Sequence, residues 1–259
     1  MAIEVTKANG ILTLAFDRIE RKNAITSAMY QTLADAINAA QDDTEVRAIL
    51  LAGKPEAFTA GNDLEDFMKT TRANDGVAFG DRPVFQFMRA LSGSAKPVVA
   101  AVSGLAIGIG TTLLMHCDLV YAADSTKFSV PFTQLGLCPE FGSSLLMPLA
   151  GGHARAAEKL MLGEPFTAQE AYDMGIVSKV LPAAEVLEHA RAQAAKLVAL
   201  PAASIRTTKR LMTASRKAQL EAIIAEESKL FFEMLQGAEA KEAFTAFFEK
   251  RKPDFTKFA

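Results

Sequence analysis

One carboxylate, Glu140, stands in the segment LGLCPEFGSS at residues 135–144, between a proline and a run of small residues. Two interpretations of this residue are open. Pro139 has no amide hydrogen to leave unpaired, and an acidic side chain suits the positive end of a helix dipole, so the pair is typical of a helix start. A carboxylate can also serve as the general base of an enzyme. On this segment alone, the helix-start interpretation is favoured.

Three glycine-containing turns follow predicted strands, and their free amides are a second candidate for chemistry. They are AFTAGNDL at 57–64, SGLAIGIG at 103–110 and LGLCPEFG at 135–142. A strand that ends in glycines and opens a helix leaves backbone N–H groups that can bind a developing oxyanion. A phosphate cradle is not favoured, because no G-x-G-x-x-G motif or P-loop lysine is present. The AGND turn alone could also be a plain turn in which Asn62 or Asp63 caps a helix.

The order of elements that must position these turns predicts an α/β core. IEVTKANGILTLAFD alternates around Asn9-Gly10, which predicts a tight hairpin. SAMYQTLADAINAAQ places Met29, Leu33 and Ile37 on one helical face, with a start near Ser27. VRAILLAG, PVVAAVSG, DLVYAAD and KFSV are expected to be strands, and GTTLLMHC a short helix. This alternation indicates parallel strands joined by helices.

The C-terminal part of the chain reads differently. After about residue 135 strands nearly stop, apart from GIVSKVLP, and from Ala183 onward the pattern is almost wholly helical. Large apolar rings crowd the last two predicted helices at Phe231, Phe232, Phe244, Phe247 and Phe248. Because exposed apolar surface of this size usually marks an interface, we expect subunits to associate through this region.

Composition excludes several classes of function. The chain of 259 residues is 50% hydrophobic and 22% charged with a net charge of -2, as expected of a soluble globular protein without a general attraction to nucleic acid. Two cysteines form no CxxC pair, and three scattered histidines lack zinc-ligand spacing, so no metal site is predicted. No segment is long and apolar enough for a membrane span, and MAIEVTKANG does not read as a signal peptide. We therefore expect a cytoplasmic protein.

In this order the motifs resemble the crotonase superfamily, the enoyl-CoA hydratases and isomerases. The likeness runs over most of the chain and includes RIERKNAIT, AFTAGNDL, KPVVAAVSGLAIGIGTTLLMHCDLVYAAD, TKFSVPFTQLGLCPEFGSS and AQEAYDMGIVSKVLP. The resemblance implies an α/β fold with a spiral core of ββα units at 1–199 and a helical trimerisation region at 200–259. It also implies an acyl-CoA substrate, no separate cofactor, and a homotrimer or dimer of trimers.

The resemblance also assigns roles to individual residues. It implies that the backbone amides of Asn62 and Ile109 form an oxyanion hole. The adenine and pantetheine parts of the substrate would lie along the backbone near Ala24 and near the AGND turn. Candidate contacts for substrate are Ala24, Ala60, Gly61, Asp63, Leu64, Gly108, Phe132, Leu135 and Leu137, and those for the CoA phosphates are Arg18, Arg21 and Lys22. Lys250, Arg251 and Lys252 could reach a phosphate in a neighbouring subunit. Part of 67–81 is expected to wall the acyl pocket.

Departures from the hydratase pattern favour a different reaction. Members that add water carry two glutamates, and the corresponding positions hold Thr112 and Phe132 here. Neither side chain can act as a base near neutral pH, so hydration should be slow. VPFTQLGLCPEFGSS instead resembles the peroxisomal-type Δ3,Δ2-enoyl-CoA isomerases, in which the glutamate after LG-x-x-P is the base. This resemblance makes Glu140 the predicted base, although it could also start a helix.

Two alternatives stay open at this point. One is another crotonase reaction, such as slow hydration or a different rearrangement of an acyl-CoA. The other is an acyl-CoA-binding protein without turnover, which the presence of Glu140 beside the AGND and GIG turns disfavours. Cys138 and His116 could be reactive, but a buried thiol and a hydrogen-bonded core histidine are the favoured interpretations.

Overall fold

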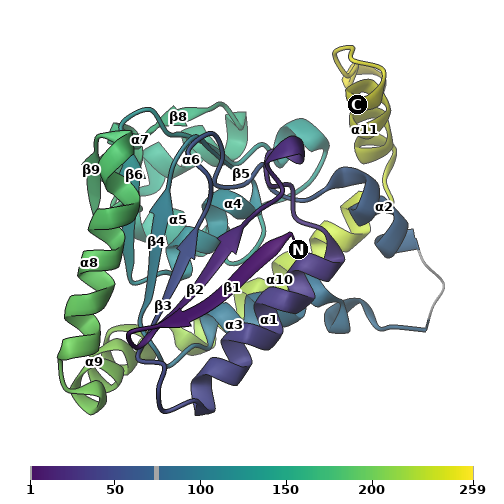
Figure 1. Cartoon of the computed structure of the whole chain (residues 1–259). Coiled ribbons are helices and arrows are strands. Elements are labelled where there is room, and N and C mark those ends of the chain that lie inside the picture. The colour runs from purple at the N-terminus through teal and green to yellow at the C-terminus, as the bar shows by residue number, and fades with distance from the viewer. Residues whose placement is uncertain (1, 73–75, 259) are drawn as a thin grey trace.

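A six-stranded sheet forms the centre of the fold in the computed structural model, which describes residues 2–72 and 76–258 (Figure 1). Its strands lie in the order β1-β2-β3-β4-β6-β9. β1 and β2 pair antiparallel, and the other neighbouring pairs are parallel. The strands are β1 (Ile3–Ala8), β2 (Ile11–Phe16), β3 (Ala48–Ala52), β4 (Val98–Val102), β6 (Leu119–Ala123) and β9 (Lys179–Leu181). The predicted parallel α/β core is therefore confirmed.

The opening hairpin forms where the sequence predicted it. Asn9 and Gly10 have φ values of 52° and 78°, so both central residues of the turn are left-handed. This geometry matches the twist of the flanking strands and explains the Asn-Gly pair. Ala8 pairs with Ile11 directly across the turn.

A smaller sheet carries one of the glycine turns. It consists of β5 (Leu105–Ile107), β7 (Lys127–Ser129) and β8 (Phe166–Thr167), with β5 parallel and β8 antiparallel to β7. β5 and β8 are additions to the predicted elements. Each is shorter than the runs of four to eight residues that indicate a strand, and β5 lies inside a segment interpreted as a glycine turn. The predicted helix GTTLLMHC is divided into α4 (Ile109–Thr112) and a 3-10 turn (Leu113–His116).

Helices cover both faces of the large sheet. Alternate residues of β3 point to opposite sides: Ile49 and Leu51 pack in one apolar cluster with Leu33 and Ile37 of α1 (Ser27–Asp42). Leu50 packs in the other cluster with α8 (Val186–Ala199). All five residues of β3 are buried, which explains its continuous apolar sequence. The other helices before α8 are α2 (Leu64–Arg72), α3 (Pro83–Ser92), α5 (Ser143–Gly151), α6 (His153–Leu162) and α7 (Ala168–Asp173).

The helical C-terminal region is confirmed from α8 onward. It continues with α9 (Ala202–Ala214), α10 (Lys217–Leu235) and α11 (Ala238–Phe248), and Figure 1 shows α11 standing away from the large sheet. Phe231 and Phe244 lie in the core of the chain, whereas Phe247 and Phe248 are exposed. The division at residue 199/200 and the role of the later part in association stay predictions. None of the helices within the described ranges is long and apolar enough to cross a membrane.

Candidate active site

Two glycine turns lie side by side and run in the same direction. Thr59 pairs in parallel with Ala106: its amide donates to the Leu105 carbonyl at 3.0 Å, and its carbonyl accepts from the Ile107 amide at 3.1 Å. Three residues beyond each member of this pair come Asn62 and Ile109. The parallel register therefore carries the two predicted oxyanion donors to equivalent positions on adjacent chain segments.

The amides of Asn62 and Ile109 are both free to receive a ligand. Ile109 is the first residue of α4, where an amide has no acceptor within the helix. Throughout the described ranges, neither of these two N–H groups has a hydrogen-bond acceptor. An oxyanion hole requires N–H donors that are not already bonded to another acceptor. The assignment of the two amides to such a hole stays a prediction.

Gly61 allows the two turns to approach this closely. Its φ is +84°, and an added Cβ would lie 2.6 Å from the Ile107 carbonyl oxygen. Such a distance is well inside van der Waals contact, so a side chain at Gly61 would push the turns apart. Its amide donates to the Thr59 hydroxyl at 3.0 Å, which holds the turn from the other side.

The loop at 18–25 fastens the first turn in place. Asn23 is fully buried, and its side-chain amide donates to the Ala57 carbonyl at 2.8 Å. The Thr59 hydroxyl donates to the Asn23 carbonyl at 2.7 Å, and the Ala60 amide donates to the Lys22 carbonyl at 2.9 Å. Sequence reasoning did not identify Asn23 as part of the site, because its partners in the glycine turn, Ala57 to Thr59, lie more than 30 residues away.

Asp63 caps α2 and binds Arg18. One carboxylate oxygen accepts from the Asp66 amide at 3.1 Å, and the other accepts from the Arg18 guanidinium at 2.8 Å. Burial opposes its ionisation, but these hydrogen bonds outweigh burial and hold the pKa of Asp63 below its usual value. Arg18 also donates to the Ala24 carbonyl at 2.9 Å, so it connects two segments predicted to contact substrate.

The remaining basic candidates differ in their surroundings. Arg21 and Lys22 are exposed at the start of the same loop. At the C-terminus, Arg251 forms a two-pronged contact with Glu242, at 2.6 and 3.2 Å, whereas Lys250 and Lys252 are exposed. A contact between any of these side chains and a CoA phosphate stays a prediction.

Glu140 is buried and lies outside a helix. The helix-start interpretation of Pro139-Glu140 is wrong, because α5 begins only at Ser143 and Glu140 lies in the preceding loop. Its side chain accepts a hydrogen bond of 2.6 Å from the hydroxyl of Thr112 on α4. Thus the helix that begins with the Ile109 amide also anchors the predicted base.

Burial changes the acidity of Glu140 strongly. Loss of water contact raises the pKa of Glu140 to about 8, although the Thr112 hydrogen bond lowers it, and the charge of Glu227 adds a further increase. Of the apolar wall predicted from the sequence, Phe132 and Leu137 are buried and Leu135 is half-buried. A contact of these side chains with Glu140 stays a prediction. A carboxylate with a raised pKa is a stronger base once it ionises.

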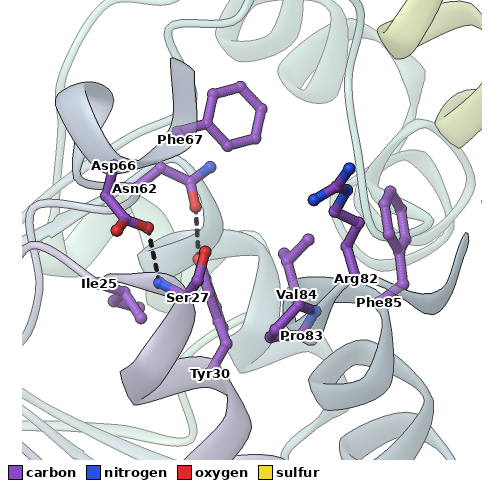
Figure 2. Close-up of a pocket in the computed structure, with 10 residues that line it drawn as sticks. All are labelled: Ile25, Ser27, Tyr30, Asn62, Asp66, Phe67, Arg82, Pro83, Val84 and Phe85. Carbon is purple, nitrogen blue, oxygen red and sulfur yellow. Dashed lines mark hydrogen bonds between the residues drawn. The ribbon is translucent and has the colours of Figure 1, made fainter. Parts of the chain in front are cut away.

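Tyr30 of α1 is attached to the first glycine turn, and Figure 2 shows its hydroxyl against the Asn62 side chain. The hydroxyl donates to Asn62 Oδ1 at 2.6 Å. The pKa of Tyr30 lies well above its usual value because of burial first, and then because of the charges of Glu140 and Asp66. Tyr30 was absent from the predicted site. Tyr30 follows Met29 on the buried side of α1, so the sequence pattern is explained by packing alone and gives no sign of a role in the site.

A small pocket opens beside Asn62 (Figure 2). It is lined by Ile25, Ser27, Tyr30, Asn62, Asp66, Phe67, Arg82, Pro83, Val84 and Phe85. Of the predicted site residues, Asn62 lines this pocket. Its volume of about 20 Å³ has room for about one water molecule, so an acyl chain would require the opening to widen. The predicted acyl wall at 67–81 contributes Phe67, and residues 73–75 of that segment lie outside the described residues.

Two residues considered as reactive have packing roles instead. The His116 ring stacks on Phe141 with centroids 3.8 Å apart, and burial lowers the pKa of His116 to about 4. A neutral ring can donate from Nε2 to the Phe141 carbonyl at 2.8 Å. Burial raises the pKa of the Cys138 thiol to about 11, which disfavours the reactive thiolate. In the described parts of the chain, no group of three potential metal ligands comes together.

Known proteins are similar to this chain in sequence and in fold. Residues 6–257 match the family described as enoyl-CoA hydratase/isomerase. A probable enoyl-CoA hydratase of Mycobacterium bovis is 33% identical over 98% of this chain and 96% of its own. Enoyl-CoA delta isomerase 2 of Rattus norvegicus is 37% identical over 87% of this chain and 58% of its own. An enoyl-CoA hydratase/isomerase of Pseudoalteromonas atlantica T6c superposes with a TM-score of 0.93 at 38% identity, covering 99% of this chain and all of that one.

The chain therefore belongs to the enoyl-CoA hydratase/isomerase family, the crotonase superfamily. It has the α/β crotonase fold, with two mixed sheets and C-terminal helices. It is a crotonase-type enzyme that acts on an acyl-CoA. Relatives named as hydratases and a relative named as an isomerase are similarly distant from this chain, so the comparisons leave the reaction itself open.

Proposed function

We propose that this chain is a Δ3,Δ2-enoyl-CoA isomerase, which moves a β,γ double bond of an acyl-CoA to the α,β position. The observation that carries the proposal is the environment of Glu140: a buried carboxylate, held by Thr112, with its pKa raised to about 8. Thr112 and Phe132 occupy the positions where the hydratase pattern has glutamates. The site therefore offers one base, which is enough for a double-bond shift and poorly suited to activating water.

The proposed reaction uses Glu140 twice. Ionised Glu140 removes a proton from the carbon next to the thioester, and the electrons move onto the thioester oxygen. The amides of Asn62 and Ile109 stabilise that oxygen, and removing one such donor from an enzyme costs about 2.7–4 kcal/mol. Protonated Glu140 then returns the proton to the γ carbon, so atoms and charge balance. No cofactor beyond the CoA of the substrate takes part.

Hydration is the second candidate, supported by the 33% identity to a probable enoyl-CoA hydratase. The direct test offers the purified chain trans-3-enoyl-CoA and, separately, crotonyl-CoA with water, and follows absorbance of the conjugated thioester. We expect isomerisation to exceed hydration by at least about 10²-fold, the contribution of one missing acid-base group. Hydration at an equal or greater rate would contradict the proposal. Tight acyl-CoA binding without either reaction would support the non-catalytic alternative.

We propose that the chain assembles as a homotrimer or a dimer of trimers through its C-terminal helices. Leu211 and Met212 on α9 are more than 60% exposed, and Phe247 and Phe248 on α11 are about half exposed. Native mass spectrometry should show three or six copies of the 27.8 kDa chain. A monomer at micromolar concentration would contradict this proposal. The cytoplasmic location stays a prediction.

A further inference from the structure

One face of α10 packs on the turn that follows Glu140. Leu220, Ile224, Glu227 and Phe231 recur at helical spacing on this face. A Cβ added to Gly142 would lie 2.4 Å from Leu220 Cδ1 and 3.4 Å from Ile224 Cγ1, so the helix lies directly against the turn. Further along, Phe231 contacts Phe132 edge to face, with ring centroids 6.4 Å apart. α10 thus touches the base-bearing turn and the apolar wall together.

Glu227 delivers a buried carboxylate to the start of α5. One oxygen accepts from the Gly142 amide at 2.5 Å. The other accepts from the Ser144 amide at 3.0 Å and from the Ser144 hydroxyl at 2.5 Å. Gly142 has no side chain with which to cap the helix, so this distant carboxylate satisfies the amides left open at the helix start. A negative charge also suits the positive end of the helix dipole.

The backbone directly after Glu140 needs such support. Phe141 and Gly142 have φ values of 58° and 74°, and Phe141 carries a side chain in this left-handed region. A non-glycine residue held there costs on the order of 1–3 kcal/mol and persists only when its surroundings enforce it. His116 holds Phe141 through its ring and its Nε2 hydrogen bond, and Glu227 holds Gly142. The direction of the Glu140 side chain depends on this doubly anchored turn.

We propose that Glu227 is a positioning residue for Glu140: its carboxylate holds the Gly142 and Ser144 amides and so fixes the turn that aims the base. This inference rests on the proposed role of Glu140 as the base. Under this inference α10, which lies in the region predicted to mediate association, also helps to position the catalytic base.

The charged groups around Glu140 determine the expected pH effect. The titratable groups whose electrostatics involve Glu140 are Tyr30 on α1, Cys138 in the same loop and Glu227 on α10. His116 reaches the turn from the 3-10 segment but stays neutral, because burial lowers its pKa to about 4. Burial also raises the pKa of Glu227, against the Ser144 and Gly142 hydrogen bonds that lower it. When Glu227 is ionised, its charge favours the protonated form of Glu140, so removing that carboxylate should lower the pKa of Glu140.

The test compares Glu227→Gln with Glu226→Gln, which removes the same charge from the adjacent, exposed position of α10. The Glu140 carboxyl carbon is followed by ¹³C NMR through a pH titration, with its signal assigned by its loss in Glu140→Gln. We expect a midpoint near 8 in the wild type and in Glu226→Gln, and a lower midpoint in Glu227→Gln. In the isomerase assay, kcat of Glu227→Gln should fall about tenfold with KM nearly unchanged, because a misaimed base affects the chemical step.

An unmoved or higher midpoint in Glu227→Gln, together with kcat within twofold of wild type, would overturn the inference. Ser144→Ala provides a second variant if Glu227→Gln does not fold, as judged by circular dichroism. It keeps the Glu227 carboxyl group and removes one of its hydrogen bonds, so kcat should fall, and unchanged kcat would contradict positioning. Because the lost hydrogen bond lowers the pKa of Glu227, the Glu140 midpoint should stay the same or fall slightly. The titration requires no turnover, so it distinguishes failure of this inference from failure of the proposed isomerase function.

Discussion

Glu140→Gln should lower kcat for isomerisation of trans-3-enoyl-CoA by roughly 10³-fold, with little change in KM, because general acid-base groups contribute about 10²–10⁴-fold. Glutamine has nearly the same shape, and its carbonyl can still accept the Thr112 hydroxyl hydrogen bond. The variant therefore removes the proton-carrying group and keeps the packing. Steady-state kinetics over a range of pH measure the effect.

The pH profile separates a lost base from a damaged fold. In the wild type the base must be ionised, so activity should rise with pH through about 8, the pKa to which burial raises Glu140. That rise should be absent from the residual activity of Glu140→Gln. Glu164→Gln is the matched control. Glu164 is an exposed residue that follows the end of α6, so this variant should keep full activity. Near-full isomerase activity in Glu140→Gln would eliminate the proposed mechanism.

The sequence predicted those parts of the site that depend on local pattern. The Asn-Gly hairpin and the face of α1 follow from periodicity, and the strands β3, β4, β6 and β7 follow from short runs of strand-forming residues. The glycine turns could also be found locally, because their glycine content by itself indicates a turn. Their juxtaposition through Thr59 and Ala106 could only be inferred from family resemblance.

The errors concern contacts between distant segments. Pro139-Glu140 has the local signature of a helix start, but α5 begins at Ser143, and its cap comes from Glu227, which is 85 residues from Gly142. When a residue of another helix supplies the cap, the sequence around the capped helix contains no capping signal. Tyr30 was missed for a related reason. Its position in α1 is consistent with a core residue, and its hydrogen-bond partner Asn62 is 32 residues away.

Gly61→Ala should lower kcat by about 10²–10³-fold, the effect of losing one oxyanion donor. The added Cβ would meet the Ile107 carbonyl oxygen at 2.6 Å, and φ at this position is +84°. To relieve this clash, the AGND turn must move away from the segment at 107–109, which carries the Ile109 amide. The two amides would then no longer converge on one oxygen atom, although Glu140 would remain in place.

Gly175→Ala provides the control for backbone strain. Gly175 has a similar φ of +74°, but its added Cβ would meet Ala150 at an ordinary distance of 3.7 Å. Both variants should lose stability, measured by thermal unfolding, because alanine is disfavoured in the left-handed region. Only Gly61→Ala should lose activity per folded molecule, and its Glu140 titration should keep the wild-type midpoint. If both variants lost activity equally, strain alone would explain the effect; if Gly61→Ala stayed fully active, the two amides would not be the oxyanion donors.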